Sequence, residues 1–282
     1  MNFGGAEGFG AKIGQNLAPK SKRAPIFEQW HKCAMREFDF EEDSEKFWNT
    51  TKKHLDECSK LTEVDQKLKI EKFNNSDEVK LAILPNLRHQ MVEFEDLVLT
   101  LGIGKDIRAE MALKNASSKI GVPLKFIGAD PMFLDNAELF SKIGTFFPLA
   151  ISGSDGFFEA SVLFQKKYKN IAVFHMRFLY FLKMVLKIQH IDHLWMDNEY
   201  SEYELFEYFF EFGTLDQNGI TVCQMNMEVH KGTVEQKSEF KNFVHKILAD
   251  RKYAILKQKF AGGHYRLYFF NFSDEFCVNK FL

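Results

Sequence analysis

Residues 96–104 read DLVLTLGIG, an apolar run that ends in two glycines separated by one residue. A continuous apolar run of this length is typical of a strand buried on both faces of a parallel sheet. Glycines after such a strand allow a tight turn and close approach of a ligand, and the helix predicted from 106 would offer free N–H groups. Gly102, Gly104 and Asp106 are therefore candidate ligand-binding residues. A plain strand-to-helix turn would also explain two glycines.

Strands and helices alternate around this run. Hydrophobic periodicity predicts strands over 79–84, 124–129, 146–151, 157–164, 171–175, 190–196 and 220–230, and helices over 106–118, 131–139, 178–188, 202–210 and 234–248. Two extended runs flank Gly262 and Gly263 and predict a terminal β-hairpin. The order predicts a doubly wound α/β fold: a mostly parallel sheet, helices on both faces and a C-terminal antiparallel hairpin.

Three regions follow from the composition of the 282 residues. Residues 1–24 are rich in glycine and are predicted to form a flexible tail. Residues 25–77 carry apolar side chains at helical spacing, so we expect a helical N-terminal extension. Residues 78–282 form the predicted α/β domain.

The overall composition excludes some classes of function. Apolar residues make up 45% of the chain, and the formal net charge is −2. A balance this close to neutral argues against a dedicated nucleic-acid-binding protein, which needs a basic surface. No apolar run approaches the roughly 18 residues that a membrane span requires. The oligomeric state is left open.

The compartment is also left open. Residues 1–20 lack the apolar core of a secretory signal, which favours the cytoplasm. The four cysteines have no metal-binding spacing, but their even number allows disulfides, and Cys33 and Cys58 lie in one segment. Glycosylation sequons begin at Asn49, Asn74, Asn115 and Asn271. These features favour the secretory pathway if the N-terminus is incomplete.

The strand predicted over 124–129 ends at Asp130, which is followed by Pro131. Ligands of open α/β sheets bind beyond the carboxyl ends of the strands. An acidic side chain at this point can accept hydrogen bonds from both ribose hydroxyls of an adenosine. Asp130 lies 26 residues after Gly104, whereas the spacing in dinucleotide-binding proteins is ~20. Capping of the following helix is the alternative explanation.

Two further strands end in titratable residues. Asp197 and Glu199 follow the strand over 190–196, with Glu202 beyond them. Carboxylates there can bind a metal, hold the amino group of a ligand, act as a general base or cap the next helix. His230 ends the strand over 220–230 and can take a proton from a substrate hydroxyl, or be structural. We name Asp197, Glu199 and His230 as candidate catalytic residues and assign no metal ligand.

Five segments in this order resemble the FkbM-type methyltransferase family, and most closely a divergent animal branch of it. They are DLVLTLGIGKDIRAE (96–110), FIGADP (126–131), FFPLAISGSDGFFEASV (146–162), the run from 178 to 206 that contains HIDHLWMDNEYSE, and ITVCQMNMEVH (220–230). The resemblance extends over about residues 78–275. It implies S-adenosylmethionine as methyl donor, and a hydroxyl of a small molecule or glycan as acceptor.

The resemblance also implies roles for single residues. Gly102 and Gly104 would pass under the methionine part of the donor, and Asp130 would hold its ribose. Asp197, which we also count among the cofactor-binding residues, would line the reaction centre with Glu199.

Two positions depart from the family pattern. Thr100 stands where most such enzymes have an acidic residue, and Tyr200 replaces a glycine. A catalytically degenerate protein that uses the same fold for binding is therefore the alternative function. A nicotinamide-dependent oxidoreductase shares the glycine turn, but Ile107 at the third glycine position and the terminal hairpin disfavour it.

Overall fold

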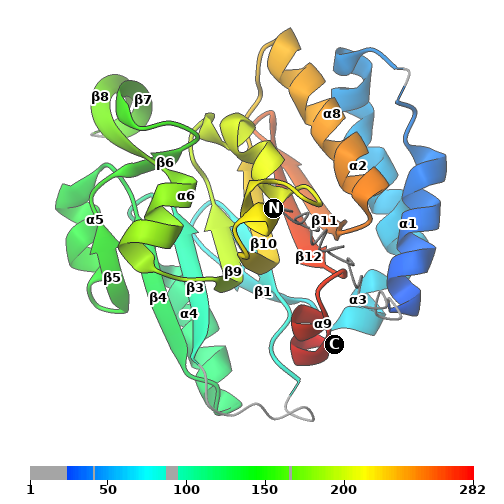
Figure 1. Ribbon diagram of the computed structural model, residues 1–282, viewed down its shortest axis with the longest axis horizontal. Coiled ribbons are helices and arrows are strands. Elements are labelled where there is room, and N and C mark those ends of the chain that lie inside the picture. The colour runs from blue at the N-terminus through cyan, green and yellow to red at the C-terminus, as the bar shows by residue number, and fades with distance from the viewer. Residues whose placement is uncertain (1–23, 41, 87–94, 165–166) are drawn as a thin grey trace, which may run out of the picture.

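The computed structural model describes residues 24–40, 42–86, 95–164 and 167–282 (Figure 1). The helices are α1 (Pro25–Glu37), α2 (Ser44–Leu61), α3 (Val64–Leu68), α4 (Arg108–Lys119), α5 (Phe133–Phe140), α6 (Phe178–Tyr180), the π-helix η2 (Phe181–Leu186), the 3-10 helix η3 (Ser201–Phe209), α7 (Thr214–Gln217), α8 (Val234–Asp250) and α9 (Glu275–Phe281). The strands are β1 (Glu71–Asn74), β2 (Val79–Ala82), β3 (Asp96–Leu101), β4 (Leu124–Ala129), β5 (Gly144–Phe147), β6 (Ala150–Ser152), β7 (Gly156–Phe164), β8 (Lys167–Arg177), β9 (His190–Met196), β10 (Thr221–Val229), β11 (Tyr253–Ala261) and β12 (His264–Asn271).

Seven strands form the central sheet in the order β11-β12-β10-β9-β3-β4-β5. The five strands β10, β9, β3, β4 and β5 are parallel to one another, whereas β12 is antiparallel to both β10 and β11. The predicted fold, a mostly parallel sheet closed by a C-terminal hairpin, is confirmed. The strand order reverses beside β3, because the chain first builds outward to β4 and β5 and later returns to β9 and β10.

Alternating side chains of the strands supply two cores, one on each face of the sheet. Leu97 and Leu99 of β3 pack in a large core that also holds residues of α1, α2 and α8. Val98 and Trp195 point to the other face and pack with residues of α4. Figure 1 shows α1, α2 and α8 side by side next to β11 and β12. The N-terminal helices therefore share their core with the sheet.

The region 25–77 is helical, as predicted, only as far as Leu68. Residues 71–74 form a strand, β1, which pairs with β2 as a separate antiparallel hairpin. Two side chains of β10 hold the backbone of β2 and of the residue after it. Asn226 bonds to both the N–H and C=O of Leu81 in β2, and Gln224 bonds to both the N–H and C=O of Ile83. The amides replace a neighbouring strand for this segment. The predicted tail lies outside the described residues, apart from Ala24.

The single strand predicted over 146–151 is wrong. Pro148, which cannot donate to a sheet, separates β5 in the central sheet from β6 in a three-stranded sheet of order β6-β8-β7. The two extended runs predicted after it, 157–164 and 171–175, pair with each other as parts of the antiparallel strands β7 and β8. This hairpin projects beside α5 in Figure 1.

All four cysteines are paired in disulfides. Cys33–Cys58 joins α1 to α2, and Cys223–Cys277 joins β10 to α9. Within the residues that the structure describes, no helix combines the length and apolar character needed to cross a lipid bilayer.

Candidate functional site

The loops after β3, β4 and β9 meet at one edge of the sheet. Leu101 is paired with both Ala129 and Met196, so the three strands end at the same level. Asp197 N–H donates to the carbonyl of Leu101 at 2.8 Å, and Gly102 N–H donates to Ala129 at 2.9 Å. These bonds hold the three loops together beside the reversal of strand order. Open α/β sheets bind their ligands at this place.

The two glycines after β3 have different structural roles. Both have a left-handed backbone, with φ of +81° at Gly102 and +62° at Gly104. A Cβ at Gly102 would lie 1.9 Å from the carbonyl oxygen of Asp197, so only glycine fits there. A Cβ at Gly104 would meet no described atom within 4 Å. The first glycine thus permits close contact between loops, while the second leaves room above the turn.

Asp130 holds this turn in place. Its Oδ2 accepts from the N–H of Ile103 at 2.8 Å and of Gly104 at 3.3 Å, and its Oδ1 accepts from Met132 N–H at 2.7 Å. The residue is 7% exposed, and burial raises the pKa of its carboxyl although these hydrogen bonds act in the opposite direction. The sequence predicted a ribose-binding or capping acid, and the role in holding the glycine turn was missed.

Asp106, also predicted to bind the cofactor, makes different contacts. Its carboxylate accepts from the N–H and hydroxyl of Ser76, both at 2.8 Å, and it pairs with Arg108. The Arg108 guanidinium, together with the hydrogen bonds, holds the pKa of Asp106 well below its usual range. Asp106 therefore fastens the turn between β1 and β2 to the start of α4.

The three predicted catalytic residues are brought together around His230, which is 6% exposed. Its Nε2 lies 3.4 Å from Glu199 Oε2 and 3.6 Å from Asp197 Oδ1. On the other side of the ring, Nδ1 lies 3.0 Å from Oε1 of the fully buried Glu202. The same oxygen accepts from the backbone N–H of His230 at 2.7 Å. One imidazole thus faces three carboxylates.

These charges determine the protonation of His230. Burial lowers its pKa, but Glu202, Asp197 and Glu199 outweigh that effect and raise the pKa to about 9. At neutral pH the ring is therefore an imidazolium, which can donate a proton. A role for His230 as base requires its neutral form.

Asp197 provides the other notable atom of the cluster. Its side chain is 31% exposed, yet Oδ1 is buried and has no hydrogen-bond partner in the described part of the chain. Burial of this oxygen, together with the charge of Glu228, raises the pKa of Asp197. A carboxyl oxygen that lies at a strand end and accepts no hydrogen bond is available to a ligand.

Two buried charged residues near the site were missed by the sequence analysis. Lys80 of β2 is 5% exposed and its Nζ lies 2.7 Å from Glu78 Oε1. Burial lowers the pKa of Lys80, but Glu78 and Asp197 raise it above its ordinary value. The sequence did contain a signal for Lys80, because it is a single lysine within the apolar run 79–84.

The second missed residue is Glu110 of α4. Thr100 Oγ1 donates to its Oε1 at 3.2 Å, so a buried carboxylate from the helix lies beside the position where the family pattern has an acid. Glu110 is 2% exposed, and burial raises its pKa to about 7.

Glu110→Gln is expected to stabilise the protein in a pH-dependent way. The pKa of Glu110 is about 7 in the folded state, whereas that of an unfolded Glu is about 4.3. Below the unfolded-state pKa, Glu110 is protonated in both states and costs wild type no stability. Wild type loses stability as the pH rises from the unfolded-state pKa through the folded-state pKa. The advantage of the variant should therefore grow by about 2.5 kcal/mol between pH 5 and pH 8. Urea unfolding at both pH values measures it; an advantage that does not change with pH would show that Glu110 is not buried as an acid.

Tyr200 has a left-handed backbone conformation, which glycine adopts most readily. Its φ is +78°, next to Glu199 with φ of +47°. The Tyr200 ring lies 5.0 Å from the ring of His230 and is 41% exposed, so it covers one side of the cluster. Tyr200 therefore places a ring beside the site from a left-handed turn.

Tyr200→Gly is expected to be more stable than Tyr200→Ala by about 1 kcal/mol, because only glycine adopts this φ without steric cost. Both variants lack the ring, so the comparison isolates the backbone. Thermal unfolding of the pair would measure the difference, and equal melting temperatures would mean that the turn is not left-handed in solution.

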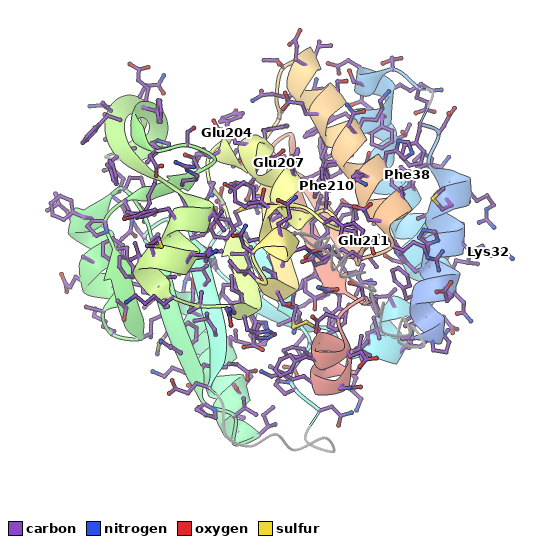
Figure 2. The ribbon with its side chains drawn as sticks, viewed as in Figure 1. Lys32, Phe38, Glu204, Glu207, Phe210 and Glu211 are labelled. Carbon is purple, nitrogen blue, oxygen red and sulfur yellow. A yellow bond between two sulfur atoms is a disulfide. The ribbon has the colours of Figure 1, made fainter. Side chains whose placement is uncertain are left out.

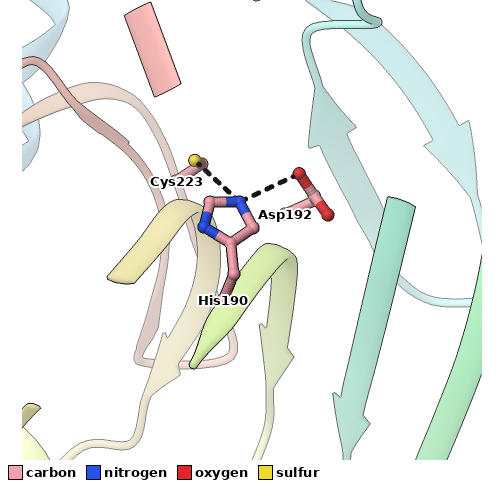
Figure 3. Close-up of side chains that lie close together, drawn as sticks. All are labelled: His190, Asp192 and Cys223. Carbon is pink, nitrogen blue, oxygen red and sulfur yellow. Dashed lines mark hydrogen bonds and ion pairs between the residues drawn. The ribbon is translucent and has the colours of Figure 1, made fainter. Parts of the chain in front are cut away.

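A second group of polar side chains lies at the opposite, amino-terminal ends of β9 and β10. Figure 3 shows His190 Nε2 between Asp192 Oδ1 at 3.2 Å and Cys223 Sγ at 3.6 Å. Cys223 is bonded to Cys277, and Asp192 is paired with Lys280 at 2.6 Å. Because the disulfide and the Asp192–Lys280 ion pair both lead to α9, this group anchors α9 to the sheet.

The chain also carries a match to a known family. A family model described as the methyltransferase FkbM domain matches residues 37–255, more than half of the chain. The chain belongs to the FkbM methyltransferase family. The FkbM domain contains β3, β4, β9 and β10, and with them every residue discussed above as a candidate for binding or catalysis. A comparison with curated proteins found no match.

Proposed function

We propose that this FkbM-family protein transfers a methyl group from S-adenosylmethionine to a hydroxyl oxygen of a small molecule or glycan. The observation that supports it best is the meeting of the loops after β3, β4 and β9, with open space above Gly104 and an Asp197 Oδ1 that makes no hydrogen bond to the described residues. S-Adenosylmethionine, when bound, supplies an electrophilic methyl group on a sulfonium. All other tasks belong to the side chains and backbone of the protein.

Binding of the donor is assigned to the three loops. Gly102 and Gly104 provide a turn on which a ligand can lie close to the backbone. Asp130 maintains that turn and offers its remaining lone pairs to ribose hydroxyls. Asp197 lies against Gly102, where its carboxyl oxygens can accept hydrogen bonds from the donor's amino group.

The acceptor's proton is assigned to Asp197. Transfer to a hydroxyl oxygen releases one proton, which Oδ1 of the ionised Asp197 can accept because it makes no hydrogen bond to the described residues. This oxygen lies 3.6 Å from His230 Nε2, and Glu199 Oε2 lies 3.4 Å from the same nitrogen, so the ring links the two acids. The contribution of the protein is chiefly the alignment of the two reactants.

A groove next to the cluster suits the acceptor. It has a volume of about 900 Å³ and runs between η3 and α8, beginning at Tyr200. Figure 2 labels Glu204, Glu207 and Phe210 along η3, and all three line the groove. Carboxylates accept hydrogen bonds from hydroxyls, and aromatic rings offer apolar faces, so the lining fits a hydroxyl-rich ligand such as a glycan.

The degenerate alternative is favoured by one observation. Asp130, the expected ribose ligand, already accepts three backbone N–H groups, which leaves little capacity for a ligand. Thr100 in place of an acid points the same way. In that case the groove between η3 and α8 would serve binding alone.

We also propose an oxidising compartment as the place of action. Both cysteine pairs are joined as disulfides, which persist in the secretory pathway and are rare in the cytosol. Asn49 and Asn74, the first residues of two sequons, are exposed. A shift in mass after glycosidase treatment of protein from its natural cells would support this assignment, and free thiols would contradict it.

Isothermal titration of the full chain with S-adenosylmethionine tests the function. We expect one donor per chain, and at least about tenfold weaker binding by Asp130→Asn, which keeps shape but loses charge and an acceptor. Asp135→Asn is the control, because that carboxylate is 60% exposed and paired with Lys105. Absence of binding by the intact protein would favour the degenerate alternative.

A further inference from the structure

We propose that Asp197, Glu199 and His230 form a binding site for a divalent transition-metal ion. Asp197 Oδ1, Glu199 Oε2 and His230 Nε2 lie within 4.8 Å of one another. Metal–ligand bonds of ~2.1 Å in tetrahedral geometry place neighbouring ligand atoms about 3.4 Å apart. The two distances from His230 Nε2, 3.4 Å and 3.6 Å, agree with that spacing.

The surroundings of His230 support the same conclusion. Metal-binding histidines usually donate their second ring N–H to a carboxylate, which fixes the ring and its tautomer. Here Nδ1 lies 3.0 Å from Glu202 Oε1, and Glu202 is fully buried. Its contact with the backbone N–H of His230 fixes Glu202 in turn. Nε2 is therefore turned toward the two other carboxylates, and an ion that binds there displaces the Nε2 proton of the imidazolium.

The missing hydrogen bond of Asp197 Oδ1 is an independent indication of a bound cation. Oδ1 of Asp197 is buried and lacks a hydrogen-bond partner among the described residues, although a buried carboxylate oxygen is costly without one. A cation held by this oxygen would satisfy it. It would also balance the negative charge of Asp197, Glu199 and Glu202 around a single imidazole.

The neighbouring groups are less suited to a metal. Glu228 and His264 also lie close to His230, but Glu228 is paired with Arg266 at 2.8 Å, and His264 Nδ1 accepts from Lys231 N–H. The set of one imidazole and two carboxylates suits zinc, manganese, cobalt or iron. An ion here would activate the acceptor hydroxyl in place of Asp197 Oδ1, a role that rests on the proposed function, whereas binding itself does not.

Titration of the EDTA-treated full chain with MnCl2, and the visible spectrum after addition of CoCl2, test the site. We expect one ion per chain and cobalt bands characteristic of nitrogen and oxygen ligands. Glu202→Gln should weaken binding about 10–100-fold, and Glu199→Gln should weaken it further. Glu138→Gln, whose carboxylate on α5 is 85% exposed, is the matched control and should bind as wild type. Circular dichroism confirms that each variant is folded.

Failure of this inference can be told apart from failure of the proposed function. No manganese binding by the full chain, or equal affinity in wild type and Glu199→Gln, would overturn the metal site. If S-adenosylmethionine still binds in EDTA, the proposed function stands. Metal binding that depends on Glu199, without any donor binding, would support the site and contradict the proposed function.

Discussion

Gly102→Ala is expected to lower the free energy of unfolding by about 3 kcal/mol and to abolish binding of the methyl donor. The added Cβ would lie 1.9 Å from the carbonyl oxygen of Asp197, and the φ of +81° is unfavourable for alanine. The backbone cost is about 1–2 kcal/mol, and forcing an atom into a filled space costs about another 1–3 kcal/mol. Relief of the clash would move Asp197 away from the turn.

Gly104→Ala is the matched control for folding. Its φ is +62°, but the new Cβ would point into open space, so we expect a loss of only about 1 kcal/mol. Urea unfolding of both variants and titration with S-adenosylmethionine measure the two effects. Equal losses of stability at the two positions, or normal donor binding by Gly102→Ala, would contradict the arrangement of loops described above.

Removal of the Cys223–Cys277 disulfide is expected to have the second large effect. The bond closes a separation of 54 residues, and the chain-entropy model gives about 4 kcal/mol for a loop of this length. It also anchors α9, whose Lys280 pairs with Asp96 at 2.7 Å and Asp192 at 2.6 Å at the amino ends of β3 and β9. Cys223→Ala/Cys277→Ala should therefore unfold at much lower urea concentration.

The other disulfide provides a comparison. Cys33–Cys58 closes a separation of 25 residues, for which the same model gives about 3.5 kcal/mol. Cys33→Ala/Cys58→Ala should thus lose slightly less stability, and reduction of wild type should produce both losses. If the Cys223→Ala/Cys277→Ala variant unfolds at the same midpoint as wild type, both with and without reductant, the Cys223–Cys277 bond does not form.

Much of the sheet could be predicted because its strands are buried on both faces. Such strands read as unbroken apolar runs, and β3, β4, β9 and β10 were all found at nearly their observed bounds. Short exposed segments carry no such signal. The sequence predicted helix for the residues of β1. Their strand is stabilised by pairing with β2, which Gln224 and Asn226 hold in turn, and such contacts leave no pattern in the local sequence.

The candidate site was predictable where it depends on strand ends. Gly102, Asp130 and Asp197 could be placed together, because the ends of neighbouring parallel strands meet at one edge. Contacts between a helix or hairpin and the sheet could not be read from the sequence. Glu110 and Lys80 reach the site in this way, and no spacing rule connects either residue to it.

An amide chemical-shift titration with S-adenosylmethionine tests the central claim most directly. The claim is that the loops after β3, β4 and β9 together hold the methyl donor. We predict that the amide signals of Gly104, Met132 and Asp197 shift together with one dissociation constant, while those of His190 and Thr221 at the amino-terminal edge stay unchanged. Shifts absent from all three loops, or confined to the amino-terminal edge, would contradict the claim.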